Sequence, residues 1–244
     1  MIPAPASSTS WYTVLLVGGL ALSGLFWIRR ARRDSRMFAL WLGALLGAFV
    51  GAKLAYVLAE GWRDFGQPDF LRRLATGKSI LGALLGGYVS VELFKRALGY
   101  RQPTGDWFAL IVPAGIALGR LGCWLNGCCL GRVCETSTWW TVRDEHGLPR
   151  WPSVPLEFAF NLIALVVLAA LRKARKFPGN LFHLYLIAYG LFRLFHEAFR
   201  DTPRLVGPLS GYSLLALSLV IFGSLRFVQR ERESHRTSQP ARMD

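Results

Sequence analysis

Acidic residues are scarce in this chain of 244 residues. Asp and Glu number 15 against 29 Lys and Arg, which gives a formal net charge of +14. Nucleic-acid-binding proteins are often this basic, but they gather the charge on one water-facing surface. Here the basic residues stand in short segments between apolar runs, so we expect no nucleic-acid partner. A charge of this size together with 52% hydrophobic residues indicates a polytopic membrane protein instead.

Long polar segments are also missing between the apolar runs, which argues against a separate soluble domain. At about 20 apolar residues for one bilayer crossing, the chain offers seven candidate spans. They cover residues 11–28, 37–59, 79–98, 107–125, 155–171, 180–198 and 210–228. We predict an all-α fold in which residues 1–228 form a single transmembrane helical domain. Residues 229–244 are expected to form a polar cytoplasmic tail, either disordered or lying on anionic headgroups.

The basic residues also predict the orientation in the membrane. None precedes the first apolar run, whereas RRARRDSR follows it directly, which predicts a retained helix with its N-terminus outside rather than a cleaved signal peptide. The loops divide accordingly, because cytoplasmic loops are enriched in Lys and Arg. Alternate segments hold 17 Lys and Arg in one group (29–36, 95–106, 172–179 and 226–244) and 9 in the other (60–78, 132–154 and 199–209). The first group, and with it the C-terminus, is predicted to be cytoplasmic.

Three basic residues remain inside or at the edges of the spans: Lys53, Arg120 and Arg193. A lysine can extend toward the interface, and we expect this of Lys53. An arginine at mid-membrane costs about 2.5–3.5 kcal/mol, so an anionic partner is expected for each arginine. The planar guanidinium matches two phosphate oxygens, which favours a phosphate ligand for Arg120. The alternative is that Arg120 ends its helix and reaches lipid headgroups.

A second group of charges lies in YGLFRLFHEAFRDTPR, residues 189–204. Helical spacing places Arg193, His196, Glu197 and Arg200 on one face. In the alternative interpretation, Arg193 and Glu197 form an internal ion pair that only neutralises itself. His196 and Arg200 would still lack a negatively charged partner, so we predict a net positive face that points into the bundle.

Cysteine is rare, and the four that occur are close together: Cys123, Cys128, Cys129 and Cys134. Their spacing, C-x4-CC-x4-C, lacks the two-residue separations of zinc knuckles and common iron–sulfur motifs. By the predicted topology they lie near the outer face, where disulfides can form. We therefore expect small packing residues or a disulfide, and we expect no bound metal and no cofactor; a metal held by these cysteines is the alternative.

Six segments follow one another in the order and approximate spacing of a known family: SWY, GAKLAYVL, GKSILGALLGG, GRLGCWLNGCCLGR, WPSVPLEF and FRLFHEAFR. In these segments, over residues 10 to about 215, the chain resembles the bacterial prolipoprotein diacylglyceryl transferases. The resemblance implies a multi-pass enzyme of the bacterial cytoplasmic (inner) membrane. Its reaction moves a diacylglyceryl group from phosphatidylglycerol to the lipobox cysteine thiol of a prolipoprotein and releases glycerol phosphate. The implied partners are phosphatidylglycerol, the prolipoprotein signal peptide and other membrane lipids.

The resemblance also implies a set of site residues. Arg120 matches the essential arginine of the family signature, and Arg193 matches an arginine of the late helix. The predicted catalytic residues are Arg120, Arg193, His196 and Glu197. The predicted substrate-binding residues are Tyr12, Asn126, Gly131 and Arg200.

The chain departs from the family pattern at several positions. Leu81 replaces a histidine that is a proposed base, and Trp151 replaces a second histidine. Cys123 and Cys128 replace the asparagine and glutamate of the signature. We predict that His196, one turn from Arg193, takes over as base. The alternatives are a catalytically silent homologue that binds an anionic phospholipid, and a transferase with a different acceptor.

Overall fold

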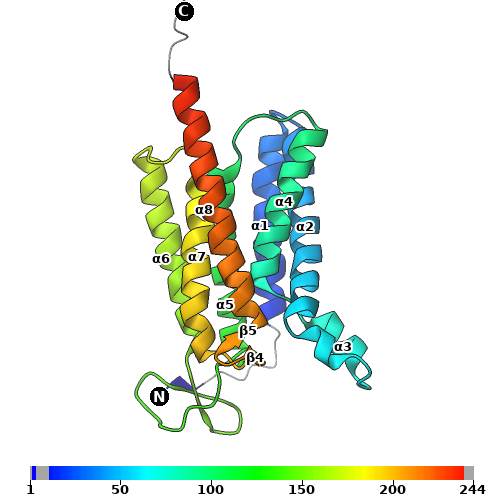
Figure 1. The fold of residues 1–244 in the computed structure, drawn as a ribbon, viewed down its shortest axis with the longest axis vertical. Helices are drawn as coiled ribbons and strands as arrows, with labels where there is room; N and C mark the ends of the chain where they lie inside the picture. The colour runs from blue at the N-terminus through cyan, green and yellow to red at the C-terminus, as the bar shows by residue number, and fades with distance from the viewer. Residues whose placement is uncertain (1, 4–10, 239–244) are drawn as a thin grey trace, which may run out of the picture.

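The computed structural model describes residues 2–3 and 11–238. Long helices run side by side in one bundle, with short hairpins at one end of it (Figure 1). The long helices are α1 (Trp11–Ala31), α2 (Arg36–Ala59), α4 (Ile80–Ala97), α5 (Gly105–Leu125), α6 (Ser153–Lys173), α7 (Leu181–His196) and α8 (Gly211–Ser238). Each of these helices overlaps one of the predicted apolar segments, so the expected all-α architecture is confirmed.

Not every helix is long and apolar enough to be identified as a membrane span. Within the described residues, α1, α2, α5, α6 and the part of α8 from Gly211 to Glu233 meet both conditions. A sixth span is possible if α4 is joined to the short helix α3 (Phe70–Thr76), which is bent from it by 62°. Helix α7 has only 16 residues, about 24 Å at 1.5 Å per residue, against about 30 Å of hydrocarbon. The chain is therefore a multi-pass membrane protein, and the crossing by all seven segments stays a prediction.

Short elements gather at the end of the bundle where α1 and α8 begin (Figure 1). They are the 3-10 helices η1 (Gly61–Asp64) and η2 (Glu197–Phe199) and the strands β1 (Ile2–Pro3), β2 (Val142–Arg143), β3 (Pro149–Arg150), β4 (Arg204–Val206) and β5 (Leu209–Ser210). Strand β2 pairs with β1 in parallel and with β3 in antiparallel register, and β4 pairs with β5 across a turn at Gly207, where φ is +54°. Helix α3, η1 and strand β4 fall in segments that the sequence indicated as loops, whereas Glu197 and Ala198 of η2 belong to the predicted span 180–198.

Lys53 fixes α3 to α2, while its extension to the membrane interface stays a prediction. Its ammonium group donates to the carbonyl oxygens of Leu74, Ala75 and Gly77, at 2.9, 2.6 and 2.8 Å. The last carbonyls of a helix have no partners within the helix, and a cation there also opposes the negative end of the helix dipole. Lys53 therefore supplies the cap that the sequence of α3 lacks.

Helices α2 and α4 have the most extensive contact in the bundle, and glycine makes it possible. A Cβ atom on Gly82 would lie 2.1 Å from the Gly51 carbonyl oxygen and 2.3 Å from the Ala55 Cβ. Gly86 meets the Gly47 carbonyl in the same way. Small residues at this spacing let helix backbones approach closely, which is how helices associate in lipid.

Helix α8 continues through the segment for which we expected a tail. It runs to Ser238, and Glu231 accepts a hydrogen bond from the Asn180 side chain at 2.6 Å. Arg230 and Glu233, one helical turn apart, lie 3.6 Å from each other. These contacts extend the helix beyond residue 228, while residues 239–244 lie outside the described residues.

Replacing Gly82 with alanine should lower the stability of the bundle by about 1–3 kcal/mol, because the new methyl group forces α2 and α4 apart. The matched control is Gly115→Ala, where nothing lies within 4 Å of the added Cβ. Thermal unfolding of the purified proteins in detergent measures both changes. Equal unfolding midpoints for the two variants would show that this close contact contributes nothing.

Candidate active site

A buried carboxylate, Glu157, lies at the centre of the site. It occupies the second turn of α6 and is fully inaccessible to solvent. Its Oε2 pairs with Arg120 Nη2 of α5 at 2.9 Å, and its Oε1 accepts a hydrogen bond from the Tyr189 hydroxyl of α7 at 2.6 Å. Breaking a buried ion pair leaves an uncompensated charge. Arg120 and Glu157 therefore hold each other in place and join three helices.

Arg193 is held on the other side of this cluster. Its Nη2 donates to Glu197 Oε2 at 2.9 Å and its Nη1 donates to His196 Nδ1 at 2.7 Å. The second carboxylate oxygen of Glu197 accepts from the hydroxyls of Thr202 and Ser210, at 2.5 and 2.8 Å. The ion pair that the sequence left open as an alternative is thus present. Glu197 is anchored on both oxygens and fixes the position of Arg193.

His196 has both ring nitrogens engaged. Its Nε2 lies 2.8 Å from the carbonyl oxygen of Ser153, and since a carbonyl only accepts, Nε2 carries the hydrogen. Its Nδ1 then accepts from Arg193, which makes the ring neutral. The ring is fully buried and stacks on Phe192 with centroids 4.8 Å apart. In this arrangement His196 orients Arg193, and its role as a base stays a prediction.

Two arginine N–H groups at the site have no partner within the part of the chain that the structure describes. The Nε atoms of Arg120 and Arg200 are both buried, and neither has a hydrogen-bond acceptor there. A buried donor without a partner costs about 1–3 kcal/mol. A phosphate oxygen is an acceptor of the right charge for both donors. The site therefore offers buried, positively charged donors to an anion.

Arg200 follows η2 and is close to several charges. Its own burial lowers the pKa of the guanidinium, and the charges of Arg193 and Arg120 lower it further. Glu60, the residue that ends α2, interacts with Arg200 and accepts a hydrogen bond from Tyr212. Burial raises the pKa of the Glu60 carboxyl, while Tyr212 and Arg200 oppose that shift. With Glu60 protonated, the three arginines outnumber the two ionised glutamates.

Tyr12 and Asn126 meet at the same end of α5. The Tyr12 backbone N–H donates to Asn126 Oδ1 at 3.4 Å, and Lys78 donates to the Tyr12 hydroxyl at 2.5 Å. Gly122 permits this approach, because a Cβ there would lie 2.8 Å from the Tyr12 Cα. The structure thus brings these two predicted substrate-binding residues together and adds Lys78, which the sequence analysis did not include.

Gly131 positions the loop that follows α5. A Cβ on it would lie 2.4 Å from the carbonyl oxygen of Trp151 and 2.5 Å from that of Phe199, and its own N–H donates to Trp151 at 3.1 Å. Glycine is required at this contact so that the loop can pack on η2. The predicted contact of Gly131 with substrate stays a prediction.

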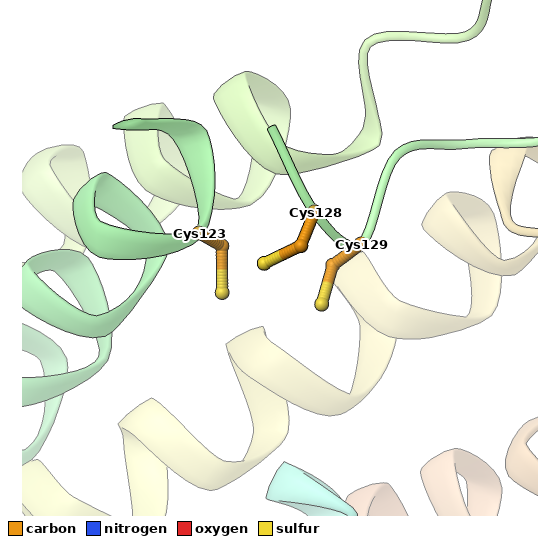
Figure 2. A group of neighbouring side chains, drawn as sticks. All are labelled: Cys123, Cys128 and Cys129. Carbon is orange, nitrogen blue, oxygen red and sulfur yellow. The ribbon is translucent and has the colours of Figure 1, made fainter. Parts of the chain in front are cut away.

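The four cysteines are all free, and three of them converge. The sulfur atoms of Cys123, Cys128 and Cys129 lie within 4.8 Å of one another and point into one small space (Figure 2). Hydrogen bonds from Cys123 and Cys128 lower the pKa of the Cys129 thiol, and the charges of Arg120 and Arg200 act in the same direction. Cys134 lies apart and donates to the Thr136 carbonyl at 3.1 Å. The thiol cluster is therefore a neighbour of the arginine cluster.

Glu157 was not predicted as a site residue, although the sequence contains a signal for it. Glu157 stands in the apolar run LEFAFNLIAL, and a carboxylate inside a membrane helix is a functional candidate by default. Lys78 and Glu60 gave no such signal, because both lie in segments that were interpreted as ordinary loops.

Replacing Glu157 with glutamine should destabilise the protein by about 3–5 kcal/mol, because Arg120 then keeps a buried charge without its counter-ion. The control is Glu145→Gln, whose side chain is 87% exposed. Thermal unfolding in detergent compares the two variants. If Glu157→Gln unfolds at the wild-type midpoint, Glu157 does not hold the site together.

Anion affinity should rise as the pH falls through the raised pKa of Glu60. Protonation removes a negative charge beside Arg200, whereas a phosphodiester keeps its own charge over that range. Titration with glycerophosphoglycerol at a series of pH values measures the change. The Glu60→Gln variant should bind at neutral pH as tightly as the wild type does at low pH, with little pH dependence. A wild-type affinity that is flat, or that falls as the pH falls, would refute the role given to Glu60.

Comparison with known proteins identifies the family of the chain. The sequence model of a family described as prolipoprotein diacylglyceryl transferase matches residues 2–229. A phosphatidylglycerol–prolipoprotein diacylglyceryl transferase of Paracidovorax citrulli is 34% identical over 230 residues, which cover 88% of this chain and 80% of the relative. Enzymes of the same name from Rhodospirillum rubrum and Pseudoalteromonas atlantica are 32% and 31% identical, covering 91% and 86% of this chain and 88% and 78% of the relatives. The chain belongs to the prolipoprotein diacylglyceryl transferase family.

Proposed function

We propose that this protein moves a diacylglyceryl group from phosphatidylglycerol to the lipobox cysteine thiol of a prolipoprotein. Both substrates are those in the names of its relatives. It would act as a multi-pass enzyme of the bacterial cytoplasmic membrane, with seven crossings, the N-terminus outside and the C-terminus in the cytoplasm. In this orientation the arginine cluster faces the outer side, where exported prolipoproteins emerge.

The observation that carries this proposal is the pair of buried arginine Nε donors, on Arg120 and Arg200, without protein acceptors in the described structure. The transfer breaks a bond between a glycerol carbon and a phosphate oxygen, and negative charge grows on that oxygen. Preorganised donors stabilise such charge most strongly where water is excluded. Arg120 and Arg200 would bind the phosphate, and Arg193 would add to the positive potential from its fixed position on Glu197 and His196.

The other predicted residues have supporting roles in this proposal. Tyr12 and Asn126, linked to each other beside the end of α5, would orient the headgroup or the acceptor peptide. A largely apolar cavity of about 270 Å³ lies among α1, α2, α4, α5, α7 and α8, with Trp27, Leu84 and Phe108 in its wall. Such a cavity suits an acyl chain.

Replacing Arg120 with lysine should reduce transfer by about 10²-fold or more while the protein stays folded. Lysine keeps the charge that pairs with Glu157, but it loses the planar pair of donors. Labelled phosphatidylglycerol, a lipobox peptide and mass spectrometry of the peptide measure transfer. Arg232→Lys, at an exposed position on the part of α8 remote from the site, is the matched control and should retain the wild-type rate.

The same assay separates this proposal from a catalytically silent homologue. Such a homologue would retain phosphatidylglycerol and yet give no modified peptide. Wild-type transfer by Arg120→Lys would refute the role given to the guanidinium group.

A further inference from the structure

Three thiols meet beside the arginine cluster, and the backbone is shaped to bring them together. Cys123 lies in the last turn of α5, and the Cys128 N–H donates to its carbonyl at 3.0 Å. Gly127 and Cys129 both have φ of 62°, in the left-handed region that residues other than glycine rarely adopt. The chain folds back at this turn, so the two consecutive cysteines face Cys123 together (Figure 2).

Convergence of three sulfur atoms suits a metal better than a disulfide. A disulfide uses two thiols and leaves the third beside it without a function. Zn²⁺ binds thiolates at about 2.3 Å, which places the sulfur atoms of a tetrahedral site about 3.8 Å apart. The sulfur atoms here lie within 4.8 Å of one another, so small side-chain rotations complete such a site.

The charges and the ligand number point to an open site. Three thiolates and Zn²⁺ carry a net negative charge, and the positive charges of Arg120 and Arg200 act on Cys129 in the direction that compensates it. Structural zinc sites have four protein ligands, whereas catalytic sites have three and an open position. The remaining cysteine, Cys134, is buried apart from this cluster and donates a hydrogen bond to the Thr136 carbonyl. Cys128 and Cys129 are exposed. The fourth position is therefore accessible from outside.

We infer that Cys123, Cys128 and Cys129 bind Zn²⁺ as three thiolates and that the open fourth position takes the acceptor thiol. The first half replaces our expectation of no metal, and the second half rests on the proposed function. The buried, apolar side chain of Leu81 cannot accept a proton from the acceptor thiol. Zinc would activate the acceptor thiol without a protein base, since a thiol coordinated to a metal is deprotonated.

The step balances without an oxidant or reductant. The acceptor thiol releases its proton to solvent as it binds the metal. A sulfur electron pair then forms the new bond to the glycerol carbon while the bond from that carbon to the phosphate oxygen breaks. The bonding pair leaves with the oxygen, next to Arg120, and the product is a thioether plus glycerol phosphate.

Metal binding is tested on the purified full-length protein after reduction and metal removal. Co²⁺ serves as the probe, because thiolate ligands give it an intense charge-transfer absorption, and Zn²⁺ should displace it. We expect one equivalent to bind, and Cys123→Ser, Cys128→Ser and Cys129→Ser each to weaken binding at least tenfold. Cys134→Ser is the matched control and should bind like the wild type. Absence of the band, its persistence in all three variants, or a native thiol count that is two short because of a disulfide would each overturn the site.

The role of the open position is tested with two lipobox peptides that differ only in cysteine or serine. The cysteine peptide should change the spectrum of the Co²⁺ protein, and the serine peptide should not. Removing the metal should abolish transfer, and adding Zn²⁺ should restore it. Wild-type transfer by the metal-free protein would overturn this inference and leave the proposed function intact. A spectral response to the cysteine peptide without transfer at any metal content would support the metal site and refute the proposed function.

Discussion

The ion pair between Arg120 and Glu157 is the contact on which the site depends. It joins α5 to α6, and the Tyr189 hydroxyl extends it to α7. A charge inside a membrane protein is tolerated when another charge or backbone carbonyls compensate it, and an arginine needs an anionic partner most. Glu157 supplies that compensation, which leaves the Nε of Arg120 available to a ligand. The same carboxylate therefore makes burial of the arginine possible and determines which of its donors can face a phosphate.

The second arginine follows the same rule with different partners. Glu197 binds Arg193 and is itself held by Thr202 and Ser210, which come from the chain between η2 and α8. His196 is fixed by the Ser153 carbonyl at the start of α6. The elements that converge at this end of the bundle thus share their polar groups. This sharing explains why the loops at this end of the bundle pack so closely around residues such as Gly131.

Sequence patterns predicted the helices well, because membrane spans carry a strong and local hydropathy signal. They also predicted that Arg120 and Arg193 have anionic partners, since a charge in an apolar run is easily recognised. Glu157 had the same signal and was overlooked. The partners of Lys53 could not be predicted, because they are carbonyls at the end of α3, a helix too short and too polar to be seen in the sequence. The tautomer of His196 depends on residues 3 and 43 positions away, and the convergence of the thiols depends on left-handed backbone at Cys129; neither is visible in a linear pattern.

The most direct measurement of the central claim is which phospholipid the purified protein retains from an equal mixture of phosphatidylglycerol and phosphatidylethanolamine. Native mass spectrometry resolves the mass and the number of the lipids that remain bound to the protein. A site with buried, positively charged donors should retain the anionic phosphatidylglycerol preferentially, and Arg200→Gln should remove that preference without unfolding the bundle. Equal retention of the two lipids by the wild type would contradict the account.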